Sequence, residues 1–158
     1  MAMKREIRVA PVGVGNCASA LVQGCHYYAD SGIDRPGLMT PDFAGYLPEH
    51  LVFATAFDID VRKVGRDLSD AIFAAPNCTA RFVPSLDPLG CEVRAGYEVD
   101  SVGAFPKDTP EDRRFLPIQS PYRDAGEARR AIVKELERVK VEVVVNYYQV
   151  LRAAAETL

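Results

Sequence analysis

The apolar positions in the first part of the chain follow two kinds of pattern, and the patterns alternate. Residues 7–14 form an apolar, β-branched run that ends in glycines, as a buried parallel strand does where it enters a tight turn. Apolar residues then recur at helical spacing over 18–28, and Asn16 can cap this helix. A second apolar run over 51–57 predicts another strand, with Asp58 at its carboxyl end.

The middle of the chain continues the alternation with a weaker pattern. Residues 61–74 predict a helix that stops at Pro76. The segment 78–123 is poor in periodicity and rich in proline and glycine, and one strand is expected around 91–97. Apolar residues at helical spacing predict an amphipathic helix over 124–139.

The last part of the chain predicts a strand over 141–147 and a short helical tail over 151–156. Residues 31–50 contain glycines and prolines without a regular pattern, so we expect an inserted surface loop there. Strands that alternate with helices predict an α/β protein with a parallel sheet and right-handed connections. The length of 158 residues and the hydrophobic content of 48% suit one domain over 1–158.

Charge and composition exclude several classes of function. The net charge of -3, with acidic and basic residues interspersed, provides no positive field that would attract nucleic acid or an anionic membrane. No apolar run approaches the roughly 20 residues needed to cross a bilayer, and the charged start is unlike a signal peptide, so we expect a cytoplasmic protein. The four cysteines show no C-x-x-C pairing and no histidine at ligand spacing, so no metal site is predicted.

The candidate chemistry lies in a G-x-G-x-x-A turn between the first strand and the first helix. Gly13 permits the sharp turn, Gly15 lets a pyrophosphate approach the backbone, and the small Ala18 lets the helix pack on the strand. Asp58 would accept hydrogen bonds from the adenosine ribose hydroxyls. It follows Gly15 by more than the usual spacing of about 20 residues, and the inserted loop accounts for the excess. The alternative is a structural turn that binds no ligand.

Longer blocks around this turn resemble a known family. Residues 12–24 (VGVGNCASALVQG) and 57–73 (FDIDVRKVGRDLSDAIF) resemble the N-terminal NAD-binding half of bacterial myo-inositol-1-phosphate synthases, and 140–147 (KVEVVVNY) extends the similarity. The resemblance implies a Rossmann-like, doubly wound parallel sheet that is incomplete without a partner. Such synthases oxidise a sugar phosphate, close its ring by an aldol step and reduce the product. By resemblance, the cofactor-binding residues are Gly13, Gly15, Asn16, Cys17, Ala18 and Asp58, with Ser69 and Asp70 near the adenosine.

Three observations weigh against a retained NAD, one from strand geometry and two from departures from the family. Pro11 removes a hydrogen-bond donor within the first strand, which can displace the turn. Residues 96–104 keep only parts of the family's glycine-rich stretch, and residues 148–151 replace the loop that lies by the nicotinamide. The catalytic domain of the family is expected to be absent from this chain.

These observations favour one subunit of a split enzyme that is not active alone. A second polypeptide would supply the catalytic half, and the pair would be recruited to specialised metabolism for a ring-closing step on a phosphate- or sulfate-bearing small molecule. One alternative is a non-catalytic scaffold or regulatory subunit, and another is an NAD-binding fragment of a true synthase. The candidate contacts to the anionic substrate are Arg81, Arg94, Lys107 and Arg113.

Overall fold

The computed structural model describes residues 6–29, 37–40, 42–97 and 108–147, and places five strands there. The strands are β1 (Ile7–Val12), β2 (Leu51–Phe53), β3 (Ala56–Asp58), β4 (Val93–Ala95) and β5 (Val143–Asn146). The α-helices are α1 (Asn16–Tyr28), α2 (Leu68–Ala71) and α3 (Ala125–Arg138). Two 3₁₀ helices, η1 (Pro48–His50) and η2 (Glu111–Arg113), lie in the connections.

β1 lies inside a parallel sheet with neighbours on both edges. Val9 pairs with Phe53 of β2 and with Val143 of β5, so these two strands border β1 on opposite edges. β3 pairs with β1 and with β4. The order across the sheet is therefore β4, then β3 with β2 in line, then β1, then β5. This is the order 3-2-1-4 of the first strands of a dinucleotide-binding fold, when β2 and β3 count as one strand.

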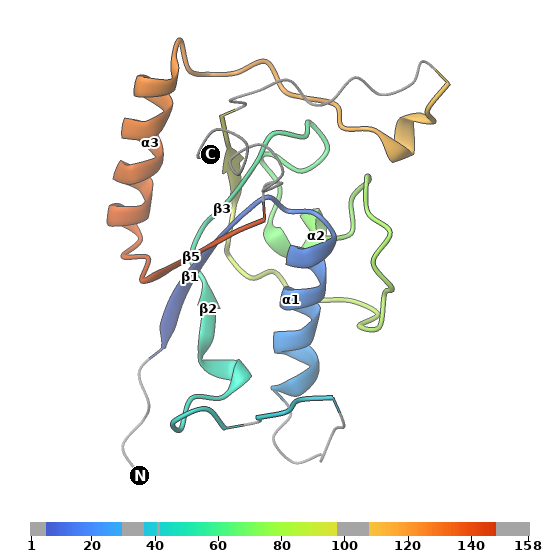
Figure 1. Ribbon diagram of the computed structural model, residues 1–158, viewed down its shortest axis with the longest axis vertical. Helices are drawn as coiled ribbons and strands as arrows, with labels where there is room; N and C mark the ends of the chain where they lie inside the picture. Colours follow the sequence, from blue (N-terminus) through green and yellow to red (C-terminus); the bar gives the residue numbers. More distant parts are fainter. Residues whose placement is uncertain (1–5, 30–36, 41, 98–107, 148–158) are drawn as a thin grey trace, which may run out of the picture.

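Helices cover both faces of the sheet, because α1 and α3 lie on opposite sides of the strands (Figure 1). The buried cluster includes Val9 of β1, Val22 of α1, Phe53 of β2, Leu68 of α2 and Val93 of β4. It therefore joins the sheet to α1 and α2, whereas the one fully covered residue of α3 is Ala128. The expected Rossmann-like, doubly wound α/β class is confirmed.

The apolar run 51–57 forms two strands rather than the predicted single one. Val9 of β1 pairs with Phe53, and Val12, three residues later, pairs with Phe57, which lies four residues after Phe53. The chain opposite β1 therefore contains one extra residue, a bulge, between β2 and β3. Successive residues of a strand turn their polar groups to alternate edges. The oxygen of Val9 accepts from Ala54 and the nitrogen of Gly13 donates to Phe57. Pro11 lies between Val9 and Gly13 and therefore faces the same edge, at the position of the extra residue. Pro11 has no N–H, and at this bulge no hydrogen-bond donor is needed from it.

The predicted helix over 61–74 is wrong in extent, since only Leu68–Ala71 is α-helical. Side-chain carboxylates compete for the backbone there: Asp58 accepts from the amides of residues 59 and 60, and Asp60 accepts from the amide of residue 62. Gly65 then adopts a φ of +83°, which ends any continuous helical turn. Asp67 caps α2 by accepting from the amide of Ser69.

The prediction that Asn16 caps the first helix is also wrong. Gly15 is the N-cap residue, and Asn16 is the first residue of α1. The helix expected over 124–139 is confirmed at Ala125–Arg138, where Asp124 caps it by accepting from the amide of Glu127. The strands expected around 91–97 and over 141–147 are observed as the shorter β4 and β5.

Two expectations stay untested by the fold. The tail over 151–156 lies outside the described residues, and the division into one domain with an insertion at 31–50 stays a prediction. Of that insertion, the structure describes a turn in which Phe43 and Tyr46 form an antiparallel bridge, followed by η1. No described helix combines the length and the apolar character that a membrane span needs.

Candidate functional site

The glycine turn lies where β1 ends and α1 begins, at the carboxyl edge of the sheet. Gly13 has a φ of +93°, in the left-handed region that favours glycine, and its amide donates to the oxygen of Phe57 at 2.8 Å. Gly15 has a φ of −100°, which any residue adopts, and a Cβ added there would meet nothing within 4 Å. Ala18 is fully buried, so α1 approaches the sheet closely.

Val14, between the two glycines, is held by charged side chains through both of its backbone groups. Its amide donates to Oδ2 of Asp58 at 2.6 Å, and its oxygen accepts from Nζ of Lys63 at 2.5 Å. Nζ also lies 3.4 Å from the oxygen of Pro76. Lys63 is 0% exposed and Asp58 is 4% exposed. Burial lowers the pKa of Lys63, and the nearby carboxylates of Asp58 and Asp60 oppose this shift.

A second buried carboxylate ties the end of β3 to the segment before α3. Oδ1 and Oδ2 of Asp60 accept from Nε and Nη2 of Arg62 at 2.8 and 2.7 Å, and Oδ2 also accepts from the amide of Leu116. Burial alone would raise the pKa of Asp60, but these hydrogen bonds hold it below its ordinary value. Arg62 donates in addition to the oxygens of Glu111 and Arg114. The chain around η2 is thereby fixed beside the carboxyl edge of the sheet.

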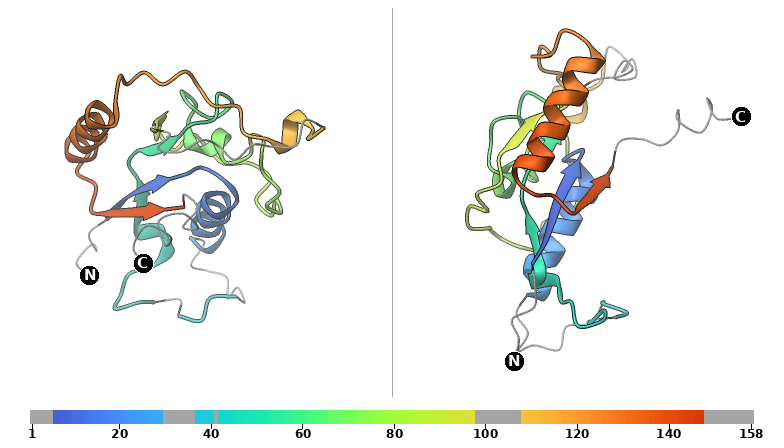
Figure 2. Two further views of the ribbon diagram at one scale, coloured as in Figure 1. Left: turned by 45° about the horizontal axis from the view of Figure 1, so that its top comes forward. Right: turned by 90° about the vertical axis from the view of Figure 1, so that its left-hand side faces the viewer.

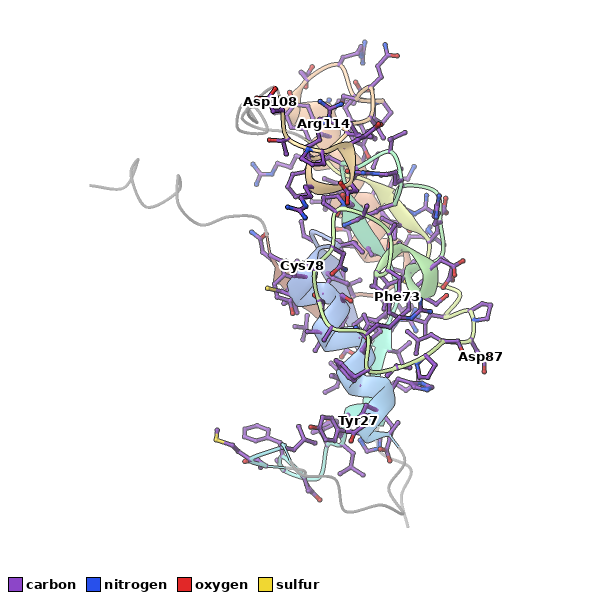
Figure 3. The ribbon with its side chains drawn as sticks, turned by 90° about the vertical axis from the view of Figure 1, so that its right-hand side faces the viewer. Tyr27, Phe73, Cys78, Asp87, Asp108 and Arg114 are labelled. Atoms are coloured by element: carbon purple, nitrogen blue, oxygen red, sulfur yellow. The ribbon has the colours of Figure 1, made fainter. Side chains whose placement is uncertain are left out.

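The segment 77–83 runs along α1 and forms a wall beside the glycine turn. Oδ1 of Asn16 accepts from the amide of Cys78 at 2.9 Å, and Oγ1 of Thr79 donates to the oxygen of Asn16 at 2.9 Å. Farther along α1, Oε1 of Gln23 accepts from the amides of residues 82 and 83. Figure 3 shows Cys78 beside the start of α1 and Tyr27 at its other end. Asn16 thus holds this wall instead of capping the helix.

The structure brings together most of the residues expected to bind a cofactor. Gly13, Gly15, Asn16, Cys17 and Ala18 form the turn and the first turn of α1, and Asp58 contacts the turn directly. The amide groups of a first helical turn have no acceptor within their own helix, so this end of α1 offers donors to an anion. Asn16 and Cys17 are exposed there.

Comparisons with known proteins identify relatives that match most of the chain. No protein-family model matches the chain. The inositol-3-phosphate synthase of Mycolicibacterium smegmatis is 42% identical over 147 residues, which are 92% of this chain and 37% of the synthase. The chain is inositol-phosphate-synthase-like. It spans little more than a third of the length of the curated relatives that it matches.

Two solved structures share the fold of this inositol-phosphate-synthase-like chain. The crystal structure of Ari2 superposes with a TM-score of 0.70 and 30% identity, over 91% of this chain and 38% of Ari2. A myo-inositol-1-phosphate synthase-related protein from Thermotoga maritima superposes with a TM-score of 0.62 and 22% identity, over 90% of this chain and 34% of that protein. The chain therefore shares its α/β fold with both proteins.

Ser69 and Asp70, expected near the adenosine, lie on α2. Oγ of Ser69 donates to Oδ1 of Asp67 at 2.6 Å and Ser69 is 4% exposed, whereas Asp70 is exposed. Asp67 also accepts from the amides of residues 89 and 91, so Ser69 belongs to a network that closes the loop before β4. A cofactor contact by either residue stays a prediction.

The candidate anion contacts are not gathered into one site. Arg81 donates to the oxygen of Pro84 and lies over the ring of Phe73, at 4.1 Å from its centroid. Arg94 forms ion pairs with Glu92 and Glu135, and so links β4 to α3. Arg113 lies in η2, and Lys107 lies outside the described residues. Their role in binding an anionic substrate stays a prediction.

Sequence reasoning missed Lys63, Asp60 and Thr79, which all take part in the site. A signal was present, because charged residues follow directly on a buried strand in the run 58–63 (DIDVRK). A lysine in sequence is usually taken as exposed, so only the fold reveals that this one is buried. Over the described ranges, no group of three or more His, Cys, Asp or Glu residues could hold a metal ion.

An apolar cavity of about 320 Å³ lies between α3 and the carboxyl ends of β1 and β3. It is lined by Val12 and Phe57 of the strands, by Tyr97 after β4, and by Ile132 and Val133 of α3. Most of the lining is apolar contact area, and its polar side chains are the phenol of Tyr97 and the guanidinium of Arg129. Among the described residues, the buried charged side chains, which are Asp58, Asp60 and Lys63, lie around the turn rather than at this cavity.

Proposed function

We propose that this chain is the dinucleotide-binding part of an inositol-phosphate-synthase-like enzyme, and that its glycine turn holds the pyrophosphate of NAD. The observation that carries the proposal is the open space over Gly15. Gly13 needs glycine for its φ, but Gly15 needs it neither for its backbone angle nor for packing. A ligand that approaches the backbone at Gly15 explains the missing side chain.

The residues at the turn fit such a ligand. The helix start supplies amide donors and positive potential to the pyrophosphate, and the small Ala18 sets the distance between α1 and β1. Bound NAD would supply a hydride acceptor. Asp58 accepts three backbone amides and is almost fully buried, so we assign it first to holding the turn. A contact between Asp58 and the adenosine ribose rests on the family resemblance.

We further propose that a second polypeptide completes the enzyme at β5. Figure 2 shows β5 at the margin of the sheet beside β1, and Val143 and Val144 are 43% and 49% exposed. An open parallel edge with exposed valines favours pairing with another strand. The relatives that carry the synthase name are more than twice as long as this chain. We infer that the completed enzyme closes a ring on a phosphate- or sulfate-bearing substrate in specialised metabolism.

The test compares two glycine substitutions in α1 and its cap. Gly15→Ala fills the open space, so we expect the dissociation constant for NAD to rise at least about tenfold, while stability falls by no more than about 1 kcal/mol because alanine is a poor N-cap. Gly24→Ala is the control, since a Cβ there also meets nothing within 4 Å and lies away from the turn. Isothermal titration calorimetry on the chain with its co-expressed partner measures both. Equal NAD affinity in both variants would refute the proposal.

A non-catalytic scaffold is the second candidate. It is favoured by the contacts of Asn16 with Cys78 and Thr79, which engage part of the turn within the protein itself. The chain is expressed together with the proteins encoded by neighbouring genes, and a native mass spectrum of the product separates the two candidates. A scaffold would be found bound to a partner chain but without the added mass of NAD. In that case, alanine at Arg94 or Arg113 would also leave the turnover of the complex unchanged.

A further inference from the structure

Two oppositely charged side chains from one short segment form hydrogen bonds to the backbone of the glycine turn. Asp58 ends β3 and Lys63 follows five residues later, and both side chains reach back to the same residue, Val14. Asp58 accepts from the N–H of Val14, and Lys63 donates to its C=O. The nearly complete burial of both groups keeps water from replacing either contact.

The Lys63 contact determines which way the next amide points. A trans peptide group is planar, and the C=O of one residue points opposite to the N–H of the next. The oxygen of Val14 points to Nζ of Lys63, which is fully buried. The N–H of Gly15 must then point away from the interior, on the residue where a Cβ would meet open space.

We infer that Lys63 is a positioning residue of the nucleotide site, which with Asp58 locks the Val14 backbone and presents the Gly15 N–H to an anionic ligand. This deepens the function proposed above and rests on it only for the identity of the ligand. A buried ammonium is unfavourable unless it is paired and hydrogen bonded. Here it gains the oxygens of Val14 and Pro76 and the nearby charge of Asp58.

The two charges should act as a unit, because each fixes one half of the same backbone residue. Removing either frees Val14, and removing the second then has little left to release. If Asp58 instead served the ligand by a separate contact, the effects of the two substitutions would multiply. The effect of the double variant therefore shows whether Asp58 and Lys63 act through the same backbone residue or through two separate contacts.

The experiment uses Lys63→Met, Asp58→Asn and the double variant, with Ile72→Val as a control that perturbs the buried core. Without ligand, hydrogen exchange is followed at the amides of Gly13 and Ser19, which bond to Phe57 and Gly15 on either side of Val14. The amide of Ala54, bonded to Val9, is the internal reference. With ligand, the dissociation constant for NAD is measured by calorimetry.

We expect each charge variant to speed exchange at Gly13 and Ser19 about tenfold relative to Ala54, and to weaken NAD binding by a similar factor. The double variant should add less than about threefold to either effect, and Ile72→Val should change neither ratio. Unchanged exchange ratios in Lys63→Met, or single effects that multiply in the double variant, would overturn the inference. If exchange responds but the wild-type chain with its partner binds no NAD, the positioning role stands and the proposed function fails.

Discussion

Asp58→Asn gives the sharpest test of how the turn is held, because the substitution replaces one carboxylate oxygen by an NH₂ group and leaves the side-chain volume almost unchanged. The carboxylate accepts from the amides of Val14, Ile59 and Asp60 at 2.6, 2.8 and 2.8 Å. An asparagine has a single acceptor oxygen, so its NH₂ group must face at least one of these amides. A buried N–H without an acceptor costs about 1–3 kcal/mol, and the remaining bonds lose the strengthening effect of the charge.

These effects together lower the free energy of unfolding by about 3 kcal/mol. For a chain of this size, that corresponds to a fall in melting temperature of about 6–12 °C. Urea denaturation followed by circular dichroism measures the change directly. Asp87→Asn is the control, since Asp87 is exposed on the outer side of the loop that follows the wall (Figure 3). If the two variants unfold within about 0.5 kcal/mol of each other, Asp58 does not hold the turn.

Three further predictions follow from particular residues. Gly24→Ala should stabilise the chain by about 0.5–1 kcal/mol in urea denaturation, since it lies inside α1 with space for a Cβ; a loss of stability would contradict this. Hydrogen bonds hold the pKa of Asp60 below its ordinary value of 3.8, so its stabilisation is present well above that pH and declines as the pH falls through the folded-state pKa. Asp60→Asn should therefore flatten the fall in unfolding free energy that the wild type shows below about pH 5, and parallel profiles of the two proteins would refute this. Val144→Lys should leave the unfolding free energy within about 0.5 kcal/mol of wild type but reduce co-purification of a partner, because a charge blunts the β5 edge; unchanged co-purification would place the partner elsewhere.

Element types could be predicted from sequence because each strand and each long helix has its own hydrophobic period. The run that forms β1 and the periodic segment that forms α3 are both identified from the sequence, with each end within two residues of its observed position. The helix expected over 61–74 failed because Asp58 and Asp60 bond to the amides that such a helix would use. Hydrophobic period carries no information about such competition.

Some features of the site depend on neighbouring residues in the sequence, and others depend on contacts between distant segments. The turn itself is local, so its residues could be read from spacing alone. The role of Lys63 depends on a contact with Val14, 49 positions away, that exists only after β3 has paired with β1. Likewise, Pro11 counted against the turn in the sequence, and the structure removes that objection by placing a bulge opposite it. Both corrections come from how two strands align.

The two glycines of the turn carry different kinds of information about function. Gly13 would be required in any protein that makes this turn, because its φ of +93° excludes most other residues, so it supports the fold and says little about a ligand. Gly15 has ordinary backbone angles and free space, and a serine or asparagine there would cap α1 better. The backbone angles and packing do not require glycine at this position, whereas the close approach of the proposed pyrophosphate would. Under the proposed function, binding at this turn would depend on Gly15, so the substitution of Gly15 rather than Gly13 distinguishes a nucleotide site from an inherited fold.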